Sequence, residues 1–172
     1  MVVLLLVVTC GVCILIDWLI HRREVRSAAP APIPAQKPLQ EPVYAGGFRI
    51  QPEMAYHPGH TWSRQETHDT VRVGLDDFGS RLLGTVDAIE LPARGANLVQ
   101  GQQAITITKD GKRVSAIAPV SGRVVAVNEA AMTSPGALPR DPYADGWLML
   151  VQSKDLKTSF NNLMSGDLVR RW

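Results

Sequence analysis

The sequence predicts a mainly β domain with short helices, preceded by one N-terminal transmembrane helix. Two observations lead to this fold class. Short β-branched runs separated by glycines recur after residue 48, and the first 20 residues are almost wholly apolar. A proline-rich stretch lies between the two regions. With 172 residues in all, the chain has room for one domain of about 100–150 residues and its appendages.

Residues 1–20 are predicted to form a membrane anchor. At about 1.5 Å of rise per residue, a helix of this length crosses roughly 30 Å of hydrocarbon. The basic residues Arg22, Arg23 and Arg26 follow the apolar run, whereas a cleaved signal peptide carries its basic residues before it. Because cytoplasmic flanks are rich in arginine and lysine, we expect a single-pass protein of the plasma (inner) membrane, with its N-terminus outside and its C-terminal domain in the cytoplasm.

Three residues stand out within the apolar segment. Asp17 lies within one helical turn of the basic flank, so we interpret it as interfacial, with a contact to a partner helix as the alternative. Cys10 and Cys13 have the spacing of a redox pair, but lipid disfavours thiolates, and we expect two small apolar residues of the helix. They are the only cysteines, so the sequence excludes a disulfide framework or a cysteine metal site from the soluble part.

Residues 21–47 are predicted to be a basic flank and a proline-rich linker, and residues 48–172 the folded domain. Proline lacks an amide donor and favours extended backbone, which makes the linker a semi-rigid tether. The linker prolines are Pro30, Pro32, Pro34, Pro38 and Pro42.

The β-branched runs of the domain predict its strands. Each run is bounded by glycine or by another turn-forming residue. We expect strands at Val71–Leu75, Ala104–Thr108, Val114–Ala118, Arg123–Val127 and Trp147–Val151.

Capping residues and helical spacing predict three short helices and one hairpin turn. Asp76 and Asp77 can cap a helix that Gly84 closes in left-handed geometry. Apolar residues at helical spacing predict two terminal helices, Asp155–Leu163 and Asp167–Arg171. The Asp110-Gly111 pair between two strand-forming runs predicts a tight type I′ hairpin turn.

Composition argues against several classes of function. The 18 basic and 16 acidic residues give a formal net charge of +2, spread along the chain, which does not favour nucleic-acid binding. Side chains of the types that bind metals occur at His57, His60, His68, Asp76 and Asp77, but Pro-Gly interrupts the only His-x-x-His pair, and we expect no metal site. No nucleophile elbow or phosphate loop is present, so we expect no catalytic residues and no enzyme activity.

A series of motifs from His60 to Trp147 resembles the H protein of the glycine cleavage system, and their spacing is kept. The resemblance implies a flattened β sandwich of the lipoyl/biotinyl-carrier hammerhead type with short flanking helices. The motifs are His60-Thr-Trp62, Val73-Gly-Leu-Asp-Asp-Phe78, Gly84, Glu90-Leu-Pro92 with Gly95 and Gly101, Ala118-Pro-Val-Ser-Gly122, Val127-Asn-Glu-Ala130, and Asp141-Pro-Tyr143 with Gly146-Trp147. For Asn128, Glu129, Asp141, Tyr143 and Trp147 we expect structural uses, in capping, a proline-anchored loop and aromatic packing.

The sequence departs from this family at the lipoyl position. In an H protein the lipoyl-lysine belongs to a Glu-Ser-Val-Lys-Ala motif at a hairpin tip. Counting 19 residues on from Pro92 or 8 back from Pro119 gives Gly111, and the family's glutamate falls on Thr108. Lys109 and Lys112 flank the tip, but a shift of one residue turns a strand side chain to the opposite face. We therefore expect no bound cofactor, with lipoate on Lys112 or Lys109 as the alternative.

Three functional hypotheses follow. The first is a membrane-tethered, non-lipoylated interaction or assembly module with an unidentified protein partner, such as a membrane complex, and with the hairpin Lys109, Asp110, Gly111, Lys112, Arg113 as its contact surface. A solvated turn explains the same hairpin charges. The second is a lipoyl carrier of the glycine cleavage type that uses Lys112 or Lys109. The third, a cofactor-free enzyme, is the least favoured.

Overall fold

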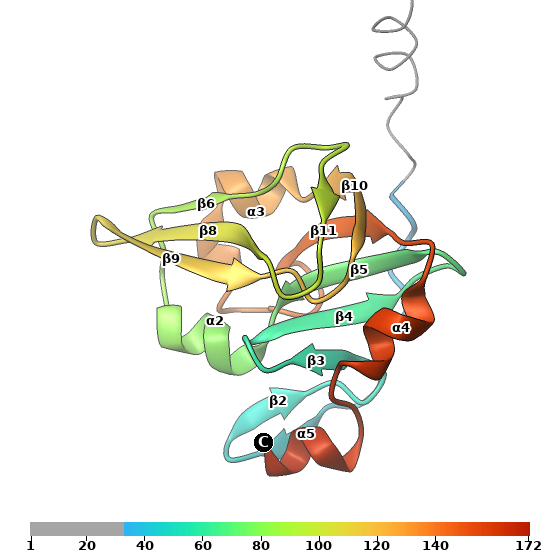
Figure 1. Cartoon of the computed structure of the whole chain (residues 1–172). Helices are drawn as coiled ribbons and strands as arrows, with labels where there is room; N and C mark the ends of the chain where they lie inside the picture. Colours follow the sequence, from blue (N-terminus) through green and yellow to red (C-terminus); the bar gives the residue numbers. More distant parts are fainter. Residues whose placement is uncertain (1–32) are drawn as a thin grey trace, which may run out of the picture. The chain divides into compact units, whose positions relative to one another are not determined.

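The computed structural model describes residues 33–172, which are mainly β with short helices (Figure 1). All strand pairs are antiparallel. The strands are β1 (Val43–Ala45), β2 (Phe48–Ile50), β3 (Ala55–His57), β4 (Thr61–Gln65), β5 (Thr70–Leu75), β6 (Ala88–Glu90), β7 (Asn97–Leu98), β8 (Gln103–Lys109), β9 (Lys112–Ile117), β10 (Gly122–Val127) and β11 (Trp147–Gln152). The helices are α2 (Asp77–Leu83), α3 (Glu129–Thr133), the 3-10 turn η1 (Pro135–Ala137), α4 (Leu156–Asn161) and α5 (Asp167–Arg171).

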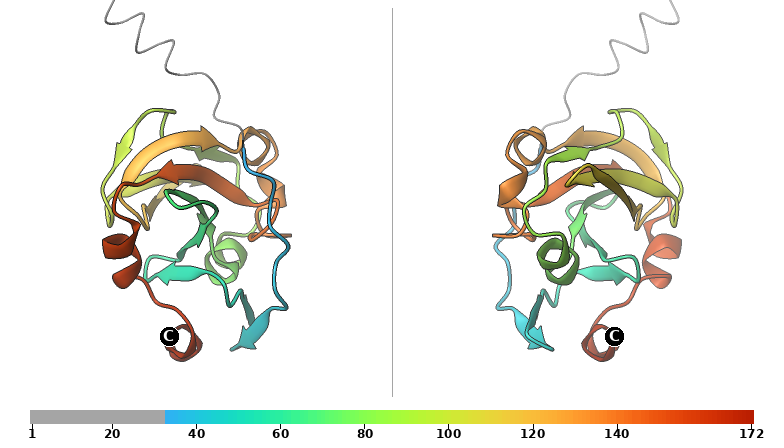
Figure 2. Two further views of the ribbon diagram at one scale, coloured as in Figure 1. Left: turned by 90° about the vertical axis from the view of Figure 1, so that its right-hand side faces the viewer. Right: turned by 90° about the vertical axis from the view of Figure 1, so that its left-hand side faces the viewer.

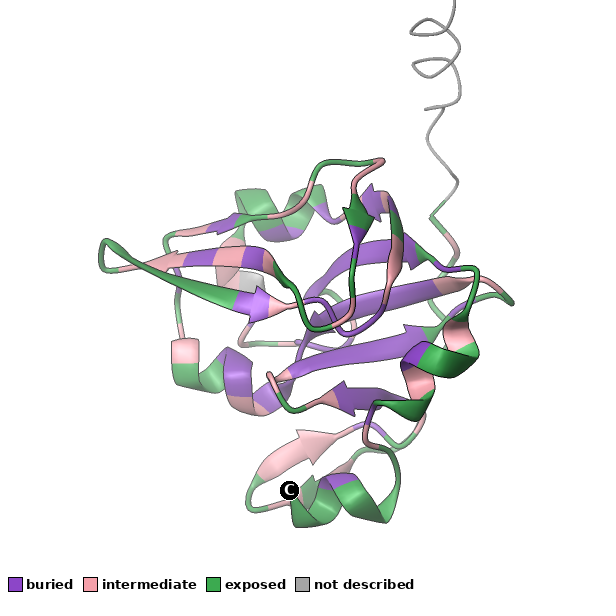
Figure 3. Cartoon of the chain, in the orientation of Figure 1, coloured by how far each residue is buried: buried purple, intermediate pink, exposed green. Residues whose placement is uncertain are grey.

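A six-stranded sheet in the order β3-β4-β5-β11-β10-β7 forms the centre of the domain. Its central strands are buried on both faces (Figure 3). In β5, Val71, Val73 and Leu75 alternate onto one face, while Arg72 and Gly74 take the other. Such a strand can form only where both faces are covered, so the remaining elements have to pack on either side.

The three-stranded sheet β6-β8-β9 covers the first face. Ile105 and Ile107 of β8 pack with Val71 and Val73 of β5 in one hydrophobic cluster, so the buried side chains of the two sheets share a core. The second face carries a smaller cluster that includes Trp62 and is completed by Val169 of α5 and by Leu39 and Ile50 from before β3. The strands predicted from β-branched runs are confirmed as β5, β8, β9, β10 and β11.

Local capping explains where the short helices begin. Asp76 accepts a hydrogen bond from the Gly79 amide, and Gly84 ends α2 at a φ of 63°, as predicted. Asp155 caps α4 through the Thr158 amide, and hydrogen bonds from the Thr158 side chain and amide lower the pKa of Asp155. Both predicted terminal helices form, the first as α4 over a shorter range. Asn128 caps α3, a helix that the sequence analysis did not predict.

Residues 33–42, here called the strap, run along the side of the domain to β1 (Figure 2). The Arg72 side chain donates to the Pro34 carbonyl at 2.9 Å, and Gln36 donates to the Ala144 carbonyl at 2.8 Å. Leu39 packs against the second hydrophobic cluster. The sequence analysis placed residues 33–47 in the linker, but the strap is bonded to the domain, and β1, which lies inside that range, pairs with β2 of the domain.

A buried charge network lies beneath the strap. Arg64 and Arg72 are directly opposite each other on β4 and β5, and Glu66 bridges them, with the Nε atoms 3.0 and 2.9 Å from its Oε1. All three residues are buried, and burial lowers the pKa of Arg72. Arg64 donates to the Lys37 carbonyl at 3.3 Å, so backbone carbonyls of the strap satisfy donors that Glu66 leaves free.

The predicted transmembrane helix over residues 1–20, with Cys10, Cys13 and Asp17, lies outside the described residues. Within residues 33–172, no helix is long and apolar enough to cross a membrane.

Candidate functional site

The β8–β9 hairpin carries the predicted contact surface at its tip. Ile105, Ile107 and Lys109 alternate onto one face of β8, the first two buried in the core. Lys109 pairs with Lys112 across the last register position, which leaves Asp110 and Gly111 as a two-residue turn. Both have positive φ, 49° and 71°, which is the requirement of a type I′ turn. The predicted turn is confirmed.

Two of the five tip residues are held by neighbouring elements. The Lys109 amine donates to the Leu83 carbonyl at the end of α2. Arg113 forms a 2.8 Å ion pair with Glu90 of β6, and both side chains are exposed. Asp110, Gly111 and Lys112 are exposed at the end of the projecting hairpin (Figure 3). The structure therefore gathers the predicted residues into one surface, with Lys112 as its most accessible lysine.

The apex position itself belongs to Gly111. A Cβ atom there would meet no heavy atom within 4 Å, so the space around it is open. Its φ of 71° is the reason for a glycine, because other L-residues are strained in this region.

The family model of the glycine cleavage H-protein matches residues 54–171 of this chain. The chain belongs to the glycine cleavage H-protein family. The glycine cleavage system H protein of Mycobacterium avium is 37% identical over 124 residues, which cover 70% of this chain and 94% of that protein. The H protein of Coxiella burnetii is 31% identical over 115 residues, covering 67% and 88%.

A solved H-protein structure supports the same assignment. The crystal structure of a glycine cleavage system H protein from Mycobacterium marinum matches with a TM-score of 0.60 and 28% identity. The match covers 69% of this chain and 94% of that one. The domain thus has an H-protein fold, and the strap with β1 and β2 precedes the part that matches the family model.

Several residues of the H-protein motifs have the structural uses predicted for them. Asn128 donates to the carbonyls of Asp145 and Trp147 at 2.9 and 2.7 Å while it caps α3. The Asp141 carboxylate accepts from the Tyr143 and Ala144 amides. These bonds fix the loop that enters β11, so the motif residues hold the fold together.

The histidines and aspartates considered as metal ligands have separate partners. His60 Nδ1 lies 3.0 Å from Asp76 Oδ2, whereas Asp77 pairs with Arg81 at 2.9 Å and with Arg49 at 3.4 Å. His68 is exposed beside Asp69. Burial lowers the pKa of His57, whose Nδ1 accepts from the Gly59 amide. Within residues 33–172, no three His, Cys, Asp or Glu side chains gather as metal ligands would.

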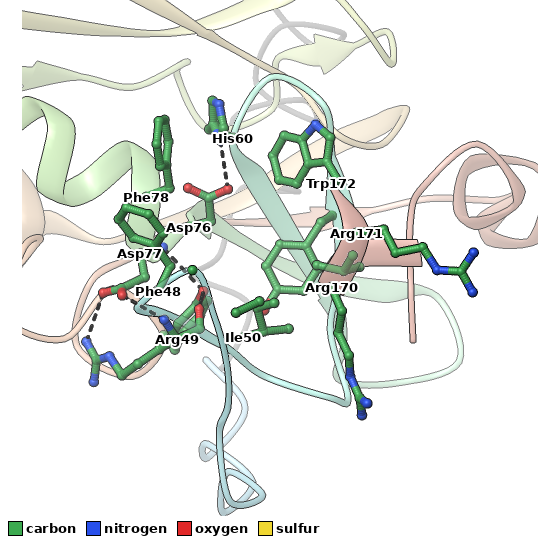
Figure 4. Close-up of a pocket in the computed structure, with 15 residues that line it drawn as sticks. Phe48, Arg49, Ile50, His60, Asp76, Asp77, Phe78, Arg170, Arg171 and Trp172 are labelled. Carbon is green, nitrogen blue, oxygen red and sulfur yellow. Dashed lines mark hydrogen bonds and ion pairs between the residues drawn. The ribbon is translucent and has the colours of Figure 1, made fainter. Parts of the chain in front are cut away.

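A cavity that the sequence analysis missed lies between β2, α2 and α5 (Figure 4). Its volume is about 480 Å³, and aromatic rings form much of its wall. His60 stacks between Phe78 and Trp172, with ring centroids 4.5 and 4.7 Å away, and Phe48 meets Phe78 edge-on at 5.0 Å. No local pattern links Phe48 to Trp172, because they are brought together only by the folding of β2 and α5.

Two buried tyrosines, Tyr56 and Tyr143, also line this cavity. The Tyr143 hydroxyl donates to the Arg49 carbonyl at 2.6 Å and accepts from the Asp77 amide at 3.2 Å. Burial raises the pKa of Tyr143 to about 12 and also raises the pKa of Tyr56, so both phenols stay protonated over the neutral range.

Proposed function

We propose that this chain is a membrane-tethered member of the H-protein family that carries no lipoyl group and acts as a protein-interaction or assembly module without catalytic activity. The observation that carries the proposal is the apex of the β8–β9 hairpin. The motif spacing assigns the lipoyl-lysine position to Gly111, whose positive φ belongs to a tight turn. With no amine at this position, the swinging arm of an H protein has no attachment point there.

The contacts of the two flanking lysines support the main proposal over its alternative. The Lys109 amine is engaged by the Leu83 carbonyl. Lys112 is exposed and comes directly after the apex, which makes it the better carrier candidate. It pairs with Lys109, and paired side chains lie on the same face of a hairpin, so Lys112 is directed to the α2 side rather than along the apex.

The first experiment is intact-mass measurement of the full chain purified from its native membrane, followed by peptide mapping across residues 105–114. We expect an unmodified chain from cells whose other lipoyl proteins are fully modified. As a matched control, residues 108–112 are replaced by Glu-Ser-Val-Lys-Ala, which restores the family motif on the same scaffold. If only this variant is lipoylated, the missing lysine at the apex explains why the natural chain is not. A lipoyl adduct on Lys112 or Lys109 of the natural chain would instead establish the carrier role.

The membrane tether is tested by fractionation. The apolar run over residues 1–20 supports retention of the full chain in membranes washed with alkaline carbonate. A chain that starts at Ile33 is expected in the supernatant. Proteolysis from the cytoplasmic side is expected to remove the domain, because the basic flank follows the apolar run. Release of the full chain by carbonate would contradict the tether.

The hairpin surface is tested by charge reversal. Lys112→Glu inverts one exposed charge at the tip, and Lys157→Glu on α4 is the matched control on an exposed helix. We expect Lys112→Glu to lower the recovery of proteins that copurify with the solubilised full chain, and Lys157→Glu to leave it unchanged. Equal recovery with both variants would reject the hairpin as the contact surface.

A further inference from the structure

We infer that the cavity between β2, α2 and α5 binds an alkylammonium group, presented as the lysine side chain of a partner protein. The inference rests on the proposed interaction function and names the chemistry of the partner. About 480 Å³ of space is available, within the range of roughly 300–1,000 Å³ that ligand pockets occupy. This volume accommodates a lysine side chain together with part of its backbone.

The walls are aromatic, with one face each of Phe78 and Trp172 covered by His60 and the rest of the ring surface open to a ligand. Phe48, Phe78 and Trp172 line the cavity (Figure 4). The π faces of such rings carry negative potential and attract ammonium groups. The structure already contains one cation–π contact of this kind, because the Arg81 guanidinium lies 5.7 Å from the centroid of the Phe48 ring. An alkyl chain ending in an ammonium group satisfies both the apolar and the electrostatic character of these walls.

One carboxylate of the lining, that of Asp76, has no arginine partner. Asp77 is neutralised by Arg49 and Arg81. Asp76 is 4% exposed, and its side chain bonds to the Gly79 amide at 2.6 Å and lies 3.0 Å from His60 Nδ1. No guanidinium contacts Asp76 within the described part of the chain. Its carboxylate therefore provides a negative charge between the rings.

The arginines near the cavity do not oppose this charge. Figure 4 shows the guanidinium groups of Arg170 and Arg171 pointing away from the rings. The Arg49 guanidinium pairs with Asp77 and donates a hydrogen bond of 3.3 Å to the Arg140 carbonyl. Arg49, Arg170 and Arg171 belong to the lining, but their guanidinium groups are directed away from Asp76, so this carboxylate meets none of them.

The site differs in position from the hairpin tip. Phe48 lies before residues 54–171 that match the H-protein family model, and Trp172 lies after them. The cavity is thus built partly by segments outside the matched domain. A partner can engage it without contacting the apex of the β8–β9 hairpin.

The test is titration of the full chain, in a non-ionic detergent, with Nα-acetyl-lysine amide. Binding is followed by the NMR shift of the Trp172 indole N–H, assigned with Trp172→Phe. The matched ligand is Nα-acetyl-norleucine amide, which has the same carbon skeleton without the ammonium group. We expect the lysine compound to bind at least about fivefold more tightly than the norleucine compound. Equal binding of the two, or tighter binding of Nα-acetyl-glutamate amide, would overturn the inference.

Variants locate the interaction. Asp76→Asn removes the charge but keeps a good helix cap, whereas Asp167→Asn removes an exposed carboxylate of α5 that is paired with Arg170. We expect the first to weaken lysine binding about fivefold or more and the second to leave it unchanged. Trp172→Ala should weaken binding and Trp172→Phe should restore most of it, read out by the other shifted resonances. Unchanged binding in Asp76→Asn would exclude the carboxylate as the recognition group.

The outcomes also separate this inference from the proposed function. A lipoylated Lys112 would contradict the non-lipoylated module while leaving lysine binding in the cavity intact. An unmodified chain whose cavity shows no preference for lysine over norleucine would retain the interaction module and reject its lysine partner.

Discussion

Gly74 shows how one residue decides the packing of the second core. It lies opposite Trp62 on β4 and Trp147 on β11. A Cβ atom at this position would come within 2.6 Å of the buried Trp62 ring. Strand residues are rarely glycine because it adds no packing, but here the close approach of an indole ring requires it.

Gly74→Ala is therefore expected to destabilise the domain by about 1–3 kcal/mol through overpacking. Gly136→Ala is the control, because a Cβ atom there would meet nothing within 4 Å. Urea unfolding of both variants measures the difference. A Gly74→Ala protein as stable as the natural chain would show that the Trp62 ring moves aside freely.

Tyr143 predicts how stability depends on alkaline pH. Burial raises its pKa from 10.0 to about 12, so the folded state holds the phenolic proton more tightly than the unfolded chain. The stabilisation is complete below pH 10 and is lost as pH rises towards 12, by on the order of 2–3 kcal/mol. Tyr143→Phe should flatten this decline, whereas Tyr44→Phe, at an exposed tyrosine, should not. Urea unfolding as a function of pH measures this loss of stability. Identical declines in both variants would show that Tyr143 does not cause it.

At the scale of elements, the strongest local signals predicted the strongest pairings. The β-branched runs became β5, β8, β9, β10 and β11, and the Asp-Gly pair became the turn between β8 and β9. Among the strands that were missed, β4 has five residues but no β-branched run, whereas β1, β2, β3, β6 and β7 have two or three residues each. So short a segment carries no periodicity, and its pairing is decided by the strand beside it.

The β4–β5 pair contains the buried Arg64–Glu66–Arg72 network, which yields an element-scale prediction. Arg72→Met leaves the buried Glu66 with one arginine and removes the contact of Arg72 with the Trp147 ring, 4.9 Å from its guanidinium carbon. Breaking such a network is expected to cost about 3 kcal/mol or more. Arg113→Met breaks the exposed pair with Glu90 and should change stability by about 0.5 kcal/mol or less. Denaturant unfolding compares the two, and equal small effects would show that the buried network adds nothing.

At the scale of the whole molecule, the strap extends the H-protein domain beyond its family boundaries. Its carbonyls at Pro34 and Lys37 bond the two buried arginines, and Leu39 joins the second hydrophobic cluster. A segment that the sequence presents as a spacer is therefore part of the folded unit.

Deleting residues 33–42 from the full chain is expected to lower the free energy of unfolding by on the order of 2 kcal/mol, because two hydrogen bonds to charged groups are lost. Hydrogen exchange should rise in β4 and β5 in the same protein. Pro34→Ala keeps the backbone carbonyl and should have little effect on either measurement. Unchanged exchange after the deletion would show that the strap is not held to the sheet in solution.

The sequence by itself determined the H-protein domain, its principal strands, the caps of α2 and the apex of the hairpin. Each of these depends on local signals: β-branched runs, an Asp cap, an Asp-Gly turn, or motifs at fixed spacing. It also predicts that Gly111 occupies the lipoyl position, since counting between two proline motifs needs no coordinates.

Only the tertiary structure decided the roles of residues whose partners are distant in the chain. It joined Phe48 to Phe78 and Trp172 around Asp76, engaged the Lys109 amine with Leu83, and attached Pro34 to Arg72. These contacts span tens of residues, and no repeat or spacing along the chain encodes them. They form because the two faces of the central sheet must both be covered, and the segments that cover the second face bring their side chains with them.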